Sequence, residues 1–251
     1  MYCVGIDIGS AAAKVIVMSQ DNSEILHHLL MPTGWSSKET ALNIQGKLKE
    51  INVTMDNSHI TATGYGRVSV PYADKVVTEI TCHGRGAYYL NGNDCTVIDI
   101  GGQDTKIISV KNGMVSNFIM NDKCSAGTGR FLEIMANTLG VDLKEIFDLS
   151  ERGNEVSISS MCTVFAESEV ISLIGNGRPK EDIAWGVVNS IANKVYTLTS
   201  KINSDNETYF LTGGFCESRY MREQLGKKLN KTVNSNHMAR YAGAIGAALS
   251  K

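Results

Sequence analysis

The feature that most constrains the fold of this chain is an internal repeat. Residues 7–14 read DIGSAAAK and residues 99–106 read DIGGQDTK, so that Asp, Ile, Gly and Lys recur in the same register. Apolar, strand-like runs flank both segments, as in a β-hairpin whose turn contains glycine. A hairpin pattern that occurs twice predicts two lobes built on one plan.

Strands and helices alternate through the rest of the chain, which indicates α/β layers. We expect further strands over residues 59–63, 114–120 and 208–211, and helices over 38–51, 79–90, 130–139, 163–174, 181–202, 218–229 and 242–249. The expected organisation is an N-terminal lobe over 1–93, a second lobe over 94–238, and a C-terminal helical segment over 239–251 that packs back on the first lobe.

Charge and composition exclude some classes of function. The 251 residues carry a formal net charge of -2, with 24 basic and 26 acidic side chains, and show no basic stripe of the kind that binds nucleic acid. No run approaches the roughly 18 consecutive apolar residues that span a membrane. We therefore expect no nucleic-acid or membrane partner and a cytoplasmic protein. Its six cysteines are then better read as reduced, catalytic or metal-binding residues than as disulfides.

Both hairpins have the features of a phosphate-binding loop. Such a loop needs backbone N–H groups turned toward one point, and small residues that let a phosphate approach. Asp7 and Asp99 would lie at strand ends, where a carboxylate can hold Mg²⁺ through water, and Lys14 could reach a phosphate as a point charge. One such turn would be an ordinary hairpin. Two in register favour a nucleotide site, although the standard P-loop and dinucleotide fingerprints are absent.

Further glycine-rich segments and one glutamine add to this hypothesis. Gly127-Thr128-Gly129 and Gly213-Gly214 follow later strands. Gln103 stands beside the second loop, and phosphoryl transfer relies mainly on positioning and charge stabilisation. A glutamine there could orient water or sense a γ-phosphate, or it could be an exposed turn residue.

Two cysteines differ from the rest. Cys124 and Cys162 each precede a predicted helix, and helix N-termini favour thiolates and anionic clusters. A four-iron cluster usually needs four thiolates, so two per chain would complete it only across a two-fold axis. Two unconnected thiols, or zinc bound by the same four sulfurs, are alternatives. The cysteines without such a position are Cys3, Cys82, Cys95 and Cys216.

Taken together, these segments resemble a known group of ATPases. The hairpins and residues 211–214 resemble the two phosphate motifs and the adenosine motif of the actin, hexokinase and heat-shock ATPase superfamily, whose members bind ATP in a cleft between duplicated lobes. Residues 121–131 (NDKCSAGTGRF) and 159–169 (SSMCTVFAESE) are more specific. They resemble the ATP-dependent activators of 2-hydroxyacyl-CoA dehydratases, also called component A or archerases, and the match covers essentially the whole chain.

The resemblance implies an α/β fold of two duplicated actin-like lobes with a nucleotide cleft, and an ATP hydrolase coupled to electron transfer. It implies a homodimer that shares one [4Fe-4S] cluster through Cys124 and Cys162, and that uses ATP or ADP with Mg²⁺. Its electron acceptor would be an iron–sulfur dehydratase or reductase, and its donor a ferredoxin or flavodoxin. Asp7, Asp99 and Gln103 would form the catalytic set, with both aspartates near magnesium. The nucleotide contacts implied are Gly9, Ser10, Ala11, Ala12, Ala13, Lys14, Gly101, Gly102, Gln103, Asp104, Gly127, Thr128, Gly129, Gly213, Gly214 and Gly243.

Some residues leave questions open. The family often has hydroxyl side chains between the first-loop Ser and Lys, and Ala11 and Ala13 remove them here. Residues 64–67 (GYGR) form either a simple turn or a partner contact, and Glu169 is expected to face solvent. Two rival functions remain: a small-molecule kinase of the same fold, for which no insertion supplies a substrate pocket, and a non-enzymatic actin-like assembly protein, for which the cysteine positions would be accidental.

Overall fold

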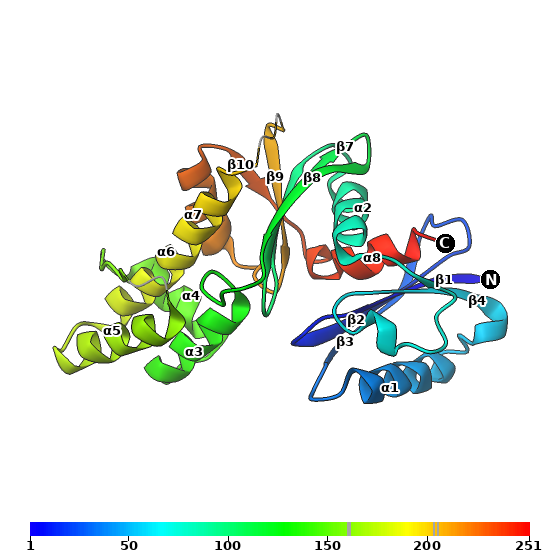
Figure 1. The fold of residues 1–251 in the computed structure, drawn as a ribbon, viewed down its shortest axis with the longest axis horizontal. Coiled ribbons are helices and arrows are strands. Elements are labelled where there is room, and N and C mark those ends of the chain that lie inside the picture. Colours follow the sequence, from blue (N-terminus) through cyan, green and yellow to red (C-terminus); the bar gives the residue numbers. More distant parts are fainter. Residues whose placement is uncertain (160–161, 203, 205) are drawn as a thin grey trace. The chain divides into compact units, whose positions relative to one another are not determined.

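The computed structural model describes residues 1–159, 162–202, 204 and 206–251, so Ser160 and Met161 of the second cysteine motif lie outside the described residues. It contains two five-stranded sheets, coloured in chain order in Figure 1. The chain divides into two compact units, the first made of Met1–Val97, Ile108–Phe118 and Asn236–Lys251 and the second of Ile98–Ile107 and Ile119–Ser235. The prediction of a two-lobed α/β fold is therefore confirmed, while the exact lobe boundaries stay a prediction.

The first sheet has the strand order β3-β2-β1-β4-β5. Its strands are β1 (Tyr2–Ile8), β2 (Ala12–Met18), β3 (Ile25–Pro32), β4 (Ser58–Thr63) and β5 (Lys75–Val76). The helices of this unit are α1 (Ser37–Glu50), α2 (Glu79–Asn91) and α8 (Ala242–Ala248), with short 3₁₀ turns η1 (Met55–Asn57), η2 (Arg67–Ser69) and η3 (Ala239–Tyr241). β1 pairs antiparallel with β2 and parallel with β4, so the predicted first hairpin is present.

Residue alternation along the strands decides which helix covers which face of this sheet. Val4 and Ile6 of β1 share a core cluster with Ile44 and Leu48 of α1. The neighbouring Cys3 belongs to the cluster formed with α8. Successive strand side chains point to opposite faces. The sheet is therefore the middle of three layers, between α1 and α8 (Figure 1).

The small residues of α8 allow unusually close packing. A Cβ placed on Gly246 would lie 1.8 Å from the carbonyl oxygen of Cys82 on α2, and one on Gly5 of β1 would lie 1.8 Å from that of Ala244. Gly86 of α2 approaches Ala242 in the same way. Alanine would therefore force backbone apart at each of these glycines. This explains why α8, which was predicted over 242–249 and spans Ala242–Ala248, consists of glycine, alanine and one isoleucine.

The second sheet has the order β10-β9-β6-β7-β8. Its strands are β6 (Thr96–Ile100), β7 (Thr105–Lys111), β8 (Met114–Asn121), β9 (Thr208–Gly213) and β10 (Thr232–Asn234). The helices that follow are α3 (Gly129–Leu139), α4 (Leu143–Arg152), α5 (Thr163–Gly175), α6 (Lys180–Thr199) and α7 (Arg219–Leu229). The core of the second unit is made by residues such as Phe131, Leu132 and Ile191, which are almost fully buried.

Helix α4 is absent from the sequence prediction, although local signals for it exist. The Asp142 side chain accepts hydrogen bonds from the backbone N–H groups of Lys144 and Glu145, which caps the helix N-terminus. Ile146 and Leu149 then bury one face. The predicted long helix over 181–202 is α6, which ends earlier, at Thr199. Among the described residues, no helix combines the length and apolar character needed to cross a bilayer.

Candidate functional site

The first hairpin places Asp7 at the end of β1, opposite Lys14 on β2. The Gly9 N–H donates to the Ala12 carbonyl at 3.1 Å and closes the turn. Thr33 then fixes the turn from outside, because its hydroxyl donates to the Gly9 carbonyl at 2.8 Å and its N–H donates to the Ala11 carbonyl. The backbone of the predicted phosphate loop is thus held before any ligand arrives.

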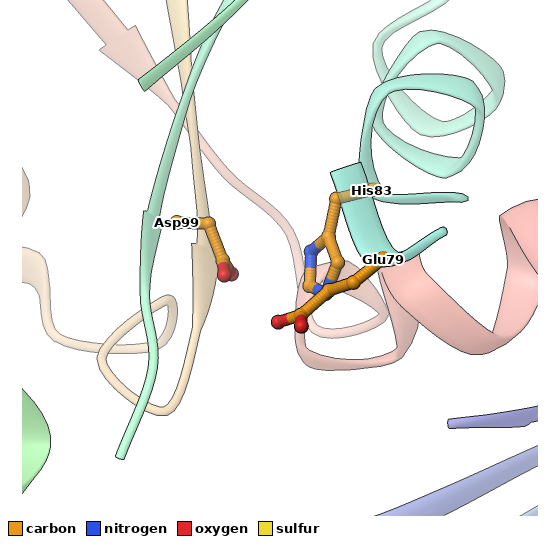
Figure 2. A group of neighbouring side chains, drawn as sticks. All are labelled: Glu79, His83 and Asp99. Carbon is orange, nitrogen blue, oxygen red and sulfur yellow. The ribbon is translucent and has the colours of Figure 1, made fainter. Parts of the chain in front are cut away.

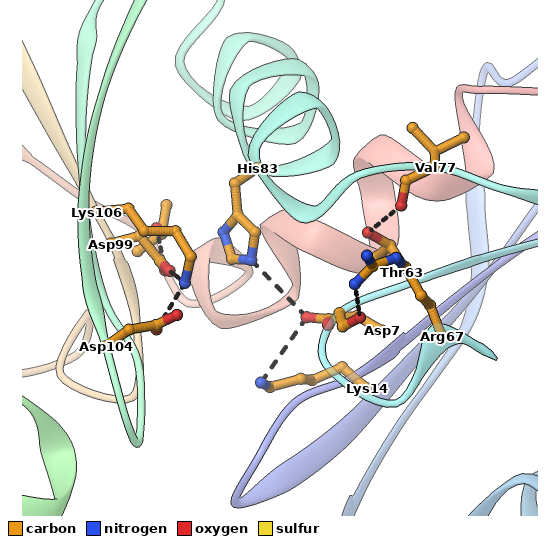
Figure 3. Close-up of polar contacts among 11 residues, drawn as sticks. Asp7, Lys14, Thr63, Arg67, Val77, His83, Asp99, Asp104 and Lys106 are labelled. Atoms are coloured by element: carbon orange, nitrogen blue, oxygen red, sulfur yellow. Dashed lines mark hydrogen bonds and ion pairs between the residues drawn. The ribbon is translucent and has the colours of Figure 1, made fainter. Parts of the chain in front are cut away.

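Asp7 lies in a tight, buried environment. The carboxylate is 3.8 Å from Lys14 Nζ and 3.9 Å from His83 Nε2, as the dashed lines in Figure 3 show. A Cβ on Gly243 would approach to 2.6 Å of Asp7 Oδ2, and one on Gly64 to 2.4 Å of Asp7 Oδ1. The predicted contact Gly243 is therefore a glycine because α8 packs directly on this carboxylate.

The second hairpin repeats this turn with different side chains. The Gly101 N–H donates to the Asp104 carbonyl at 2.9 Å. Lys106 is buried, with its Nζ 2.7 Å from Asp104 Oδ1 and 3.4 Å from Asp99 Oδ2 (Figure 3). The Thr212 hydroxyl donates to the other oxygen of Asp99 at 2.7 Å. Both oxygens of Asp99 therefore have protein partners, and the binding of Mg²⁺ at this carboxylate stays a prediction.

A third element of the repeat becomes visible only in the structure. Gly64, after β4, and Gly213, at the end of β9, both have φ +84°. Each packs on the last residue of the neighbouring hairpin strand: the Gly66 N–H donates to the Ile8 carbonyl at 2.8 Å, and the Gly214 N–H donates to the Ile100 carbonyl at 3.2 Å. Residues 64–67 are thus the first-unit counterpart of the predicted adenosine motif. The shared Thr-Gly at 63–64 and 212–213 is the sequence signal that could have revealed this match.

His83 is a further polar residue that was not predicted as part of a site. It is buried on α2, and Glu79 lies one helical turn earlier (Figure 2). Residues four apart lie on the same helix face, so both side chains belong to one polar face of α2. The proximity of His83 to Asp7 could not be read from the sequence, because the two residues lie far apart along the chain.

The predicted loop residues differ in exposure. Ala13 is completely buried in the core of the first sheet, so a hydroxyl at this position would point into the core. Ser10, Ala11 and Gln103 are exposed at the turns. Gly214 has open space beside its Cα, as expected of a residue that a ligand can approach. The assignment of these residues to a nucleotide site stays a prediction.

The six cysteines fall into two groups. Cys3, Cys82, Cys95 and Cys216 are buried, whereas Cys124 is half-buried and Cys162 is exposed. Burial raises the pKa of Cys82 to about 11 and that of Cys95 to about 12. These two residues therefore stay protonated at neutral pH and are poor metal ligands, because the thiolate is the form that binds metals.

Cys124 and Cys162 lie on segments that are joined to each other. The hydroxyls of Ser125 and Thr163, which directly follow the two cysteines, are hydrogen-bonded at 2.7 Å. Cys162 is the N-cap residue of α5, as predicted. Cys124 is not adjacent to a helix, because α3 has its N-cap at Thr128, four residues later. The structure corrects that part of the prediction.

Glu169, which is predicted to face solvent, is partly exposed and also makes contacts within the protein. Its carboxylate accepts hydrogen bonds from the Ser159 N–H at 3.0 Å and from the Ser159 hydroxyl at 3.2 Å. Ser159 lies three residues before Cys162, so Glu169 ties the approach to this cysteine onto α5. Ser159 lies in the segment before α5, outside the helix that carries Glu169, which is why the helical pattern did not reveal the contact.

The fold and the repeated hairpins define the class of protein. Each of the two sheets contains a hairpin with an aspartate near the end of its first strand, and a Thr-Gly turn at the end of the neighbouring strand. This is the plan of a two-lobed actin-like ATPase. The BadF/BadG/BcrA/BcrD ATPase family matches residues 4–250, and the chain belongs to this family.

Three relatives show how close the similarity is. The (R)-2-hydroxyglutaryl-CoA dehydratase activating ATPase of Acidaminococcus fermentans is 42% identical over 252 residues, which cover 99% of this chain and 96% of the relative. The crystal structure of this dehydratase component A superposes with a TM-score of 0.93. The activator of 2-hydroxyisocaproyl-CoA dehydratase from Clostridium difficile, solved with bound ADPNP, is 36% identical with a TM-score of 0.91, covering 99% of this chain and 93% of that one. The activator of lactoyl-CoA dehydratase of Anaerotignum propionicum is 39% identical over 99% of this chain and 96% of its own length.

Proposed function

We propose that this ATPase hydrolyses ATP to deliver single electrons from a [4Fe-4S] cluster to an iron–sulfur dehydratase or reductase, such as a 2-hydroxyacyl-CoA dehydratase. The observation that carries the proposal is the hydroxyl bridge between Ser125 and Thr163, which brings the two accessible cysteine segments together. The relatives named as dehydratase activators support the class of acceptor. A ferredoxin or flavodoxin would supply the electrons.

The residues present fit an iron–sulfur cluster. Cys162 is exposed at the N-terminus of α5, a position that favours anionic groups such as an iron–sulfur cluster, and Cys124 is half-buried on the joined segment. Two thiolates per chain require a second copy of the chain to reach the usual four, and two-fold symmetry is the commonest arrangement. Val164 and Phe165, directly after Cys162, are each 67% exposed, which supports an apolar interface with that copy.

The cluster, when bound, would supply one-electron reduction, and Cys124 and Cys162 would hold it. The other chemistry is that of ATP. Lys14 is 20% exposed and only loosely paired with Asp7, so its ammonium group can turn toward a phosphate. Asp99 is held by Thr212 and Lys106 in a fixed orientation suited to ordering water around Mg²⁺. The exposed Gln103 orients the attacking water or contacts the γ-phosphate.

The first experiment tests the cluster and the homodimer. After anaerobic purification, we expect about four iron and four sulfide per dimer, a brown colour and a dimeric mass by light scattering. Cys124→Ser and Cys162→Ser should each abolish iron binding. Cys3→Ser, at a buried strand position, is the control and should retain it. Wild-type iron in both ligand variants, or a colourless protein with stoichiometric zinc, would contradict the proposal.

The second experiment tests electron delivery. The reduced protein is mixed with a purified 2-hydroxyacyl-CoA dehydratase, and formation of the enoyl-CoA product is followed with ATP, with ADP and without nucleotide. We expect turnover only in the samples that contain ATP and Mg²⁺. Asp7→Asn and Asp99→Asn should each reduce ATP hydrolysis and turnover together, with circular dichroism as the folding control. Turnover that is independent of ATP would refute the coupling of hydrolysis to electron delivery.

A further inference from the structure

The second phosphate hairpin is hydrogen-bonded directly to the loop that carries Cys124. At the start of α3, the Gly129 N–H donates to the Gly101 carbonyl and the Arg130 N–H donates to the Gly102 carbonyl, both at 2.8 Å. A Cβ on Gly129 would lie 3.2 Å from the Gly101 oxygen, so only glycine fits this approach without displacement. The first turn of α3 therefore follows any movement of the hairpin backbone.

A buried side chain adds a third connection. The Thr105 hydroxyl, at the start of β7, donates to the Gly127 carbonyl at 2.6 Å. Thr105 is 2% exposed, and Gly127 is also buried. Because both groups are buried, water does not readily replace this bond. Loss of the donor would therefore leave the buried carbonyl unsatisfied, which costs more free energy than at an exposed position. Thr105 is thus the side chain that joins the hairpin to residues 124–129.

The connection continues from Gly127 to both cysteine segments. The hydroxyl of Thr128 donates to the Ser125 carbonyl at 2.6 Å, and Asn121 Nδ2 donates to the Cys124 carbonyl at 2.9 Å. These bonds hold the backbone of Cys124 relative to the hairpin. The Ser125–Thr163 hydroxyl bridge then reaches the N-terminus of α5, one residue after Cys162.

We propose that Thr105 is a positioning residue that transmits the nucleotide state of the second phosphate hairpin to Cys124, and through the Ser125–Thr163 bridge to Cys162. This inference rests on the proposed function, because it takes the hairpin as a nucleotide site and the two cysteines as cluster ligands. A nucleotide can change the cysteine segments only if it binds two arrangements of the hairpin with different affinity. Because Thr105 bonds the hairpin to the Cys124 loop, a change in the arrangement of one is accompanied by a change in the other.

The test uses the full-length, cluster-free chain, so that it does not depend on electron transfer. Iodoacetamide labelling of Cys124 and Cys162 is measured by peptide mass spectrometry with Mg·ADPNP, with Mg·ADP and without nucleotide. Nucleotide affinity is measured by calorimetry on the same samples. For the wild type we expect labelling rates that differ at least about fivefold between nucleotide states, the lower end of typical coupling between sites.

Two substitutions separate the steps of the connection. Thr105→Val removes the hydroxyl while keeping the shape, and should abolish most of the nucleotide response at both cysteines, while Thr105→Ser should restore it. Thr163→Val should retain the response at Cys124 and lose it at Cys162. Thr199→Val is the matched control, because within the described part of the chain the buried Thr199 hydroxyl bonds only inside α6, to Val195, and its variant should respond like the wild type.

The outcomes distinguish the inference from the function on which it rests. A wild type that binds nucleotide but labels at one rate overturns the inference and leaves the proposed function standing. A wild type that binds no nucleotide overturns both. If Thr105→Val does not fold, Thr163→Val and Thr105→Ser decide: an unchanged response at Cys162 in Thr163→Val overturns the connection, and its selective loss supports it.

Discussion

Lys14 and Lys106 occupy the same position of the repeat but have different surroundings, so the same substitution should mainly lower stability at one site and nucleotide affinity at the other. Lys106 is 1% exposed, and its Nζ lies within 3.4 Å of both Asp99 and Asp104. Lys14 is 20% exposed and its Nζ is 3.8 Å from Asp7. Methionine is the informative replacement, since it has a similar length and no charge.

The expected magnitudes follow from burial. Removing one partner of a buried ion pair costs about 3–5 kcal/mol, because Lys106→Met leaves buried carboxylate charge without compensation. In a protein of this size about 1 kcal/mol lowers Tm by roughly 2–4 °C, so Lys106→Met should lower it by about 6–20 °C. The pair of Lys14 with Asp7 is longer, at 3.8 Å, and Lys14 is partly exposed, so its loss should cost less stability than the loss of Lys106. Lys14→Met should instead weaken nucleotide binding roughly 10- to 100-fold, the value of one charge-assisted hydrogen bond to phosphate.

The assay combines thermal unfolding by circular dichroism without nucleotide with calorimetric titration of Mg·ADP. We expect Lys106→Met to cause a large loss of Tm. Lys14→Met should lower the affinity for Mg·ADP and cause a smaller loss of Tm. Equal losses of Tm in the two variants would show that burial does not separate the two lysines. A wild-type Tm for Lys106→Met would refute the buried ion pair itself.

Two further predictions concern the cysteines. Glu169→Gln weakens the charge-assisted hydrogen bonds to Ser159, so chelators should remove iron from the proposed cluster about tenfold faster. The control is Glu167→Gln, which among the described residues alters only the 3.3 Å contact with Thr138. Equal rates of iron removal in the two variants would contradict the role of Glu169. Burial raises the pKa of Cys82 from 9.0 to about 11, so the folded state holds the protonated thiol. The associated stability is complete below about pH 9 and is lost as the pH rises toward 11, and urea unfolding between pH 8 and 10.5 should show a decline that Cys82→Ala reduces; an identical decline in the variant would exclude this thiol as the cause.

The two hairpins could be predicted because the information for them is local. Strand periodicity, glycine in the turn and an aspartate at the strand end all lie within about ten residues. Most helices were found for the same reason, since apolar spacing and caps are local signals. Cys162 at the start of α5 belongs to this class as well.

The remaining site residues could not be predicted, because tertiary packing alone brings them together. Thr212 donates to Asp99 across 113 residues, and His83 approaches Asp7 only because α2 packs against α8. From sequence, a lysine beside a phosphate loop suggests a contact with a ligand. In the structure, the ammonium group of Lys106 instead contacts two carboxylates, those of Asp99 and Asp104.

Two of the four differences between the repeat segments explain why Lys14 and Lys106 have different surroundings. Asp104 of the second hairpin corresponds to Ala12 of the first, and this additional carboxylate draws Lys106 into the interior, whereas Lys14 stays partly exposed. Thr105 corresponds to Ala13, whose methyl group only fills the core, while the threonine hydroxyl bonds to the Cys124 loop. Lys14 is therefore the more accessible of the two repeat lysines. In the second hairpin the lysine is held by internal bonds, and the Thr105 hydroxyl connects the hairpin to the cysteine-bearing loop.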